Sequence, residues 1–156
     1  MHSSDYTITL LADPSQEVVF DAINDIRSWW SEDFEGDATK ENDAFAVRFG
    51  EIHYSRQSVT TLIPGKKIVW LVTESHLNFI NKKNEWTGTE ISFELSARGD
   101  KTQIRFTHHG LNPGIECFGN CSNGWNYYLQ ESLLPRINTG SGKPNRKTTD
   151  AMPLSQ

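Results

Sequence analysis

His108 has the side chain that is best placed for chemistry. It lies in the run 102–109, where Ile104, Phe106 and His108 alternate with polar residues and therefore share one face of a strand. Because that face is apolar, we expect the imidazole to point into a cavity and His109 to point outward. An inward histidine can transfer protons or orient a bound molecule. A histidine that is hydrogen-bonded for structural reasons fits the same pattern, so both interpretations stay open.

Cys117 and Cys121 form a second group of candidate residues. They are four residues apart, so on a helix they lie on one face about one turn from each other. With His108 and His109 they could form a four-ligand zinc site, but the spacing matches such sites only loosely. Two successive strand residues also cannot face one point. We therefore favour two small apolar residues packed against a sheet, and expect neither a metal nor another cofactor.

Five tryptophans are many for a chain of 156 residues. An indole combines a large apolar surface with one hydrogen-bond donor, which suits a core or the wall of a pocket. We expect Trp29 and Trp125 to line a cavity, whereas the alternation around Trp70 leaves the inward side of its strand undecided. The full set of candidate ligand-binding residues is Trp29, Trp70, Phe93, Phe106, His108, Trp125 and Tyr128.

The composition indicates one globular domain. The chain is 36% hydrophobic and 22% charged, and it is long enough to bury a core without disulfides. No apolar run approaches the roughly 18 to 20 residues of a spanning helix, and no signal peptide is visible, so we expect a cytoplasmic protein without membrane insertion. The net charge of -5 argues against nucleic acid as a partner.

Strands and turns dominate the first two thirds of the chain. Residues 6–11 predict a strand, and Asp13 as N-cap with Pro14 at the first helical position predicts a short helix, followed by a second short turn with Trp29 and Trp30. The strand-like runs that follow lack a long helical crossover, which predicts an antiparallel meander. They span residues 35–40, 44–49, 52–63, 67–74, 87–97 and 102–109.

A long helix is predicted near the C-terminus. Apolar residues recur at spacings of three and four from Phe118 to Ile137, and Pro135 should kink the helix or end it early. We expect one domain over residues 1–142 and a flexible tail over 143–156, which is small, polar and without periodicity. The chain has no phosphate-binding glycine loop, no Gly-x-Ser-x-Gly and no His-Glu-x-x-His, so an enzyme is not the favoured interpretation.

Several segments give this order of elements a specific resemblance. They are Asp13-Pro14 before Val18-Val19-Phe20, Trp29-Trp30, Ile63-Pro64-Gly65-Lys66 leading to Val69-Trp70, Glu85-Trp86-Thr87-Gly88-Thr89, Phe106-Thr107-His108, and Gly124-Trp125 with Ser132-Leu133. On these residues the chain resembles the START-like (SRPBCC) superfamily. Within it, the chain is most similar to bacterial domains that resemble activators of the heat-shock protein 90 ATPase.

The resemblance implies an α+β helix-grip fold. In this fold a curved antiparallel sheet of six to seven strands wraps around a long C-terminal helix, with two short helices after the first strand. Members of the superfamily hold lipids, sterols, polyketides or plant hormones between sheet and helix, and others are cyclases, hydroxylase domains or chaperone cofactors. Kinship at this level leaves the function open.

Three functions follow as hypotheses. The first is binding of a small apolar or amphipathic molecule of the lipid, polyketide or aromatic type between the sheet and the final helix. The second is an enzyme of the cyclase or hydrolase type, with His108 and Tyr128 moving protons. The third is a stress-response protein that has a chaperone as its partner. We expect a monomer or a weak homodimer.

Overall fold

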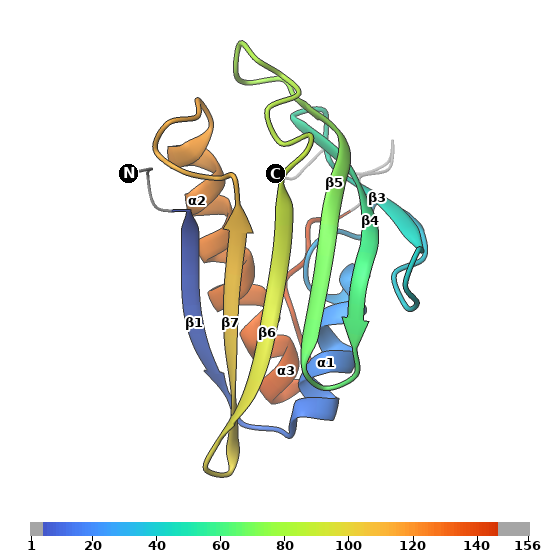
Figure 1. Cartoon of the computed structure of the whole chain (residues 1–156), viewed down its shortest axis with the longest axis vertical. Coiled ribbons are helices and arrows are strands. Elements are labelled where there is room, and N and C mark those ends of the chain that lie inside the picture. Colours follow the sequence, from blue (N-terminus) through green and yellow to red (C-terminus); the bar gives the residue numbers. More distant parts are fainter. Residues whose placement is uncertain (1–4, 147–156) are drawn as a thin grey trace.

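The computed structural model describes residues 5–146 and shows one antiparallel sheet against one long helix (Figure 1). The seven strands have the spatial order β1-β7-β6-β5-β4-β3-β2, so β1 and β2 form the two edges. The strands are β1 (Tyr6–Ala12), β2 (Phe34–Gly36), β3 (Ala44–Phe49), β4 (His53–Ile63), β5 (Lys67–Leu77), β6 (Glu90–Arg98) and β7 (Lys101–His109). This arrangement confirms the predicted meander and the helix-grip fold.

The long helix is continuous over 22 residues but changes its winding on the way. It begins as α2 (Phe118–Tyr127), widens to a π-helical segment η2 (Tyr128–Leu133) and returns to α-helix in α3 (Leu134–Thr139). We expected Pro135 to kink the helix or end it early, but the helix continues through Pro135 to Thr139. The wider turn immediately before it accommodates a residue that cannot donate to the preceding turn. The helix ends at Gly140, whose φ of 91° is the left-handed conformation of a helix C-cap.

Two short helical segments connect β1 to β2, as predicted. They are α1 (Gln16–Asn24) and a 3-10 turn, η1 (Ile26–Ser28). In Figure 1, α1 lies beside α3 at one end of the sheet. Val19, Phe20, Ala22 and Ile23 of α1 are buried, which closes that end of the core. Among residues 5–146, no helix is both long and apolar enough to cross a membrane.

The start of α1 differs from the prediction. Ser15, not Asp13, is the N-cap, and its hydroxyl oxygen accepts a hydrogen bond from the amide of Val18. The carboxylate of Asp13 instead pairs with Lys101 at 2.6 Å. The side-chain amide of Gln16 donates to the carbonyl of Gly65 in the β4–β5 turn at 2.8 Å.

Three strands begin or end several residues away from the positions that we predicted. The Asp43 carboxylate accepts hydrogen bonds from the amides of Thr39 and Lys40, so β2 ends at Gly36 and not at residue 40. Strand β5 continues to Leu77, whereas residues 87–89 form a turn before β6. The predicted turn at Pro64-Gly65 is confirmed, since Gly65 has a φ of 74°. Register shifts within the β4–β5 pair mark β-bulges, which bend strands and help the sheet to curve.

The first residues of the expected tail belong to the folded domain. The amide of Lys143 donates to the Ser132 hydroxyl at 2.7 Å, and the amide of Asn145 donates to the carbonyl of Trp30 at 2.9 Å. Asn145 also forms a parallel bridge with Ser31. The domain thus extends beyond residue 142, and the rest of the expected tail, 147–156, lies outside the described residues.

Candidate ligand-binding site

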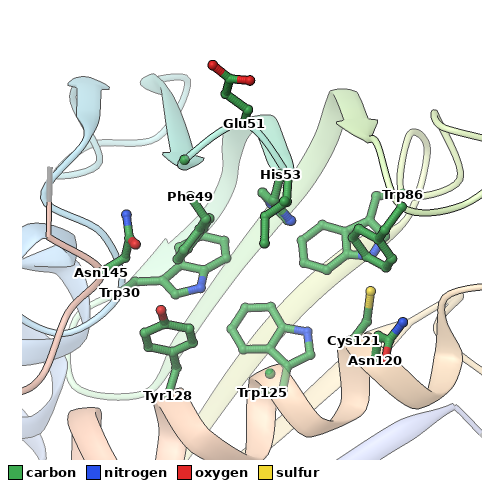
Figure 2. A pocket seen from close by; sticks show the side chains of 14 residues that line it. Trp30, Phe49, Glu51, His53, Trp86, Asn120, Cys121, Trp125, Tyr128 and Asn145 are labelled. Carbon is green, nitrogen blue, oxygen red and sulfur yellow. The ribbon is translucent and has the colours of Figure 1, made fainter. Parts of the chain in front are cut away.

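A pocket of about 650 Å³ opens between α2 and the turn that joins β3 to β4 (Figure 2). Most of its lining is aromatic and comes from elements far apart in the sequence. The aromatic residues are Trp30, Phe49, His53, Phe79, Trp86, Trp125 and Tyr128. A concave, mostly apolar site of this size is typical of small-molecule binding.

Three indole rings form one side of the pocket. Trp30 and Trp125 have ring centroids 5.0 Å apart at an interplanar angle of 22°, and Trp125 and Trp86 are 5.9 Å apart at 8°. Figure 2 shows the three rings side by side with similar orientations. Each tryptophan is at most 3% exposed, because Trp70, Phe93 and other core rings pack behind this row. We call Trp30, Trp125 and Trp86 the indole row.

His108 lies behind the indole row and is fully buried. Its Nδ1 accepts a hydrogen bond from the indole N–H of Trp125 at 3.0 Å. Nε2 must then carry the proton of the neutral ring and donate it to the hydroxyl of Thr89 at 2.9 Å, and that hydroxyl donates to the carbonyl of Trp86. Burial lowers the pKa of His108 to about 3, with smaller contributions from the neighbouring histidines. His108 therefore holds two members of the indole row in place, and both of its nitrogens are occupied.

The other expected site residues divide into two groups. Trp125 and Tyr128 line the pocket. The remaining four side chains are fully buried in the core and do not line the pocket; they are Trp29, Trp70, Phe93 and Phe106. Trp29 turns away from the pocket to donate to the carbonyl of Ile23 at 3.0 Å, and its neighbour Trp30 takes the position that we had expected for Trp29.

His53 is the imidazole that lines the pocket, and sequence reasoning did not identify it. It is the first residue of β4, with its ring edge-to-face against Trp86 and Phe49 at centroid distances of 4.7 and 4.9 Å. Nε2 lies 2.9 Å from the Ser55 hydroxyl. Burial lowers the pKa of His53 well below its ordinary value, so the ring is neutral at physiological pH. Val59 is apolar and lies an even number of residues after His53 in the same strand, so both side chains share one face. This was the one signal in β4 that could have placed His53 on the inner face.

Cys121 lines the pocket, and Cys117 is buried one turn before it. A hydrogen bond with Cys117, and then burial, raise the pKa of the Cys121 thiol above its ordinary value. The indole N–H of Trp86 is buried and has no hydrogen-bond partner among residues 5–146. Within the part of the chain that the structure describes, no group of three or more His, Cys, Asp or Glu side chains could hold a metal ion. The arrangement fits two packed thiols.

The remaining lining residues are small or uncharged except for one. Glu51 is acidic, but it is exposed and its carboxylate points away from the aromatic rings (Figure 2), and no lysine or arginine side chain lines the pocket in residues 5–146. Gly124 lies on α2 facing the pocket, and a Cβ added there would meet no atom within 4 Å. The other members are Gly50, Ile52, Asn120, Cys121 and Asn145. The site is therefore apolar, with hydrogen-bonding groups but without a cation.

Comparison with known structures supports the fold. The Aha1 dimer from Colwellia psychrerythraea is 25% identical, with a TM-score of 0.73 over 89% of this chain and 99% of that chain. The protein SSP2350 from Staphylococcus saprophyticus is 15% identical, with a TM-score of 0.68 over 90% of this chain and 96% of that chain. CalU16 from Micromonospora echinospora is 19% identical, with a TM-score of 0.61 over 84% and 73%.

Comparison of the sequence with protein families agrees with the structural likeness. No curated protein matches the chain. The family model described as "Activator of Hsp90 ATPase homolog 1-like protein" matches residues 13–134, which is most of the chain. The fold, the C-terminal helix and this match agree, and the chain belongs to the family of activator of Hsp90 ATPase homolog 1-like proteins.

Proposed function

We propose that this protein binds a small apolar or amphipathic molecule of the lipid, polyketide or aromatic type in the pocket beside α2. The observation that carries this proposal is the pocket of about 650 Å³, lined mostly by aromatic side chains. Burying apolar ligand surface against such walls contributes about 25 cal/mol per Å². Trp125 and Trp86 are held by hydrogen bonds from behind, so these two members of the indole row need little reordering when a ligand binds.

Gly124 offers a direct test of this proposal. In Gly124→Leu the new side chain would project into the pocket from the helix, without meeting other atoms close to its Cβ. The matched control is Gly119→Leu, which is also on α2 and has open space around its Cβ, but is exposed outside the pocket. Both substitutions replace a helical glycine, so their effects on helix stability are similar.

The measurement is native mass spectrometry of freshly purified protein, with extraction and identification of any co-purified molecule. We expect wild type and Gly119→Leu to retain a stoichiometric apolar compound, and Gly124→Leu to retain about tenfold less because the space is filled. Equal retention by both leucine variants would place the compound elsewhere and contradict the proposal.

A chaperone partner is a second candidate function, favoured by the family match and by the 25% identity to the Colwellia Aha1. Pull-down with a bacterial Hsp90 and an ATPase assay test it. Stimulation that persists in Gly124→Leu would assign this function to the surface and not to the pocket. The Colwellia protein is described as a dimer. We propose a weak homodimer here too, which sedimentation at several concentrations can test.

A further inference from the structure

A chain of buried polar groups runs along the inner face of β4 and ends at the pocket. Gln57 and Ser55 are fully buried, and the Gln57 amide donates to the Ser55 hydroxyl oxygen at 2.6 Å. The same hydroxyl lies 2.9 Å from Nε2 of His53, which lines the pocket. Buried polar side chains are costly in an otherwise apolar core, so a row of them that leads to a pocket calls for a physical reason.

The arrangement of these hydrogen bonds indicates one tautomer of His53. The Ser55 oxygen accepts from Gln57, and among residues 5–146 Nε2 of His53 is the one group within hydrogen-bond distance that can accept the Ser55 proton. A neutral imidazole that accepts at Nε2 carries its proton on Nδ1. No hydrogen bond within residues 5–146 engages Nδ1 of His53. His53 lines the pocket, and its Nδ1 is not among the fully buried polar atoms that lack a partner, so His53 presents an accessible N–H donor to the pocket.

A second donor, the hydroxyl of Tyr128, faces the same space (Figure 2). Tyr128 lines the pocket, and Figure 2 shows its phenol oxygen turned toward the cavity. Burial raises the pKa of Tyr128 to about 12, so this group stays protonated and can donate. Two donors near the aromatic lining suit a ligand with an oxygen acceptor.

The pocket lining in residues 5–146 contains no lysine or arginine side chain, which disfavours amphipathic ligands that carry a carboxylate. A carboxylate buried here would lose its hydration without gaining a lysine or arginine partner. Fatty acids and aromatic acids are therefore disfavoured. The row of near-parallel indoles, in contrast, favours a flat ring system that can stack on it.

We infer that the pocket selects uncharged, planar aromatic compounds with a carbonyl oxygen, and that the Nδ1–H group of His53 recognises this oxygen. This inference rests on the proposed binding function and names its ligand class. His53 is a specificity-determining residue in this scheme, and Ser55 is a positioning residue that sets its tautomer.

Three probes of nearly equal shape test the inference by calorimetric titration at pH 7. They are 2-acetylnaphthalene, 2-isopropenylnaphthalene, in which CH₂ replaces the carbonyl oxygen, and 2-naphthoate. We expect 2-naphthoate to bind at least about tenfold more weakly than the ketone, because its charge is desolvated without a partner. In His53→Phe, the ketone should lose about tenfold in affinity relative to the alkene, the factor of a single lost hydrogen bond.

Ser55→Ala provides a second measurement that does not depend on the His53 variant. Without the Ser55 donor, the proton of His53 should move partly to Nε2, which nitrogen-15 NMR of the imidazole detects directly. The ketone-to-alkene preference should fall in parallel by about threefold. A wild-type ring protonated on Nε2 would overturn the inference.

The outcomes separate this inference from the function on which it rests. If ketone and alkene bind wild type, fail to bind Gly124→Leu, and keep the same affinity ratio in His53→Phe, the binding function stands and the role of His53 is wrong. Equally tight binding of 2-naphthoate would overturn the charge selection. If none of the three probes binds wild type, both the inference and an aromatic ligand are contradicted.

Discussion

The two ends of the C-terminal helix are packed in opposite ways. Toward its C-terminus, Leu129, Leu133 and Ile137 are buried, and α3 lies against α1 and β1. Toward its N-terminus, α2 presents Gly124 and Asn120 to the pocket, and only Cys121 and Trp125 are buried. Bulk on one half of the helix builds the core, whereas small side chains on the other half leave room for a ligand.

Two glycines make the same contrast at single positions. A Cβ at Gly142 would clash with the backbone carbonyl of Ser28 and come within 3.1 Å of the carbonyl of Ser132, so the chain passes too closely for any side chain. A Cβ at Gly124 would meet nothing within 4 Å. One glycine permits close approach and the other keeps space open. The following predictions test that difference, in order of expected effect.

Leu133→Ala should be the most destabilising of these changes. The side chain is fully buried at the packed end, so its truncation removes apolar burial and leaves a cavity, at a cost of about 3 kcal/mol. Ile52→Ala at the mouth of the pocket is the comparison, and should change stability by less than about 0.5 kcal/mol because the residue is 56% exposed. Urea denaturation of both variants measures the difference. Equal losses would mean that the two ends are packed alike.

Gly142→Ala should cost about 2 kcal/mol, because backbone atoms of Ser28 and Ser132 cannot move away without disturbing the helix. Hydrogen exchange should show faster exchange at the amides of Lys143 and Asn145, which are bonded to the body of the domain. Unchanged stability together with unchanged exchange would show that the close approach at Gly142 is not tight.

The contrast also explains which parts of the molecule could be predicted from the sequence. Alternation in β6 and β7, the Pro64-Gly65 turn and the helical stripe depend on neighbours along the chain, and they gave the sheet and the helix. The same stripe placed Trp125 and Tyr128 beside the pocket. Local patterns therefore predicted the scaffold and its helical side.

The strand side of the pocket was harder to predict, because Val59 alone marks the inner face among polar residues of β4. His53, Ser55 and Gln57 are all polar on an inward face, so their pattern is typical of an outer face. Their direction follows from pairing with β3 and β5, which is a long-range property. The choice of Trp30 over Trp29 likewise depends on the turn after η1, where no periodicity assigns a face.

Acid should destabilise the protein through two histidines whose pKa is lowered by burial, His108 and His53, and His108 is the one whose share can be tested by substitution. The pKa of His108 is about 3 in the folded protein against an ordinary value of 6.5, so between these values the unfolded chain binds a proton that the folded chain does not. Stability from this group is complete above pH 6.5 and is lost as the pH falls, by about 1.4 kcal/mol per unit well inside that window. Urea denaturation at pH 6 and pH 5 measures the slope. His108→Gln, which keeps an acceptor for Trp125 but does not titrate, should have a smaller slope, and an identical slope would contradict the assignment.

Gly124→Ala should have the smallest effect, and the opposite sign. The position is helical and open, so alanine lowers the entropy of the unfolded chain and should stabilise the protein by about 0.5 to 1 kcal/mol. If open space at this end of the helix is retained for binding, the added methyl should also weaken ligand retention slightly, whereas Gly119→Ala should stabilise without that cost. Thermal unfolding and the probe titrations on both variants measure the two quantities. A destabilised Gly124→Ala would mean that this end of the helix is packed as tightly as the other, and that the pocket is not the space that separates them.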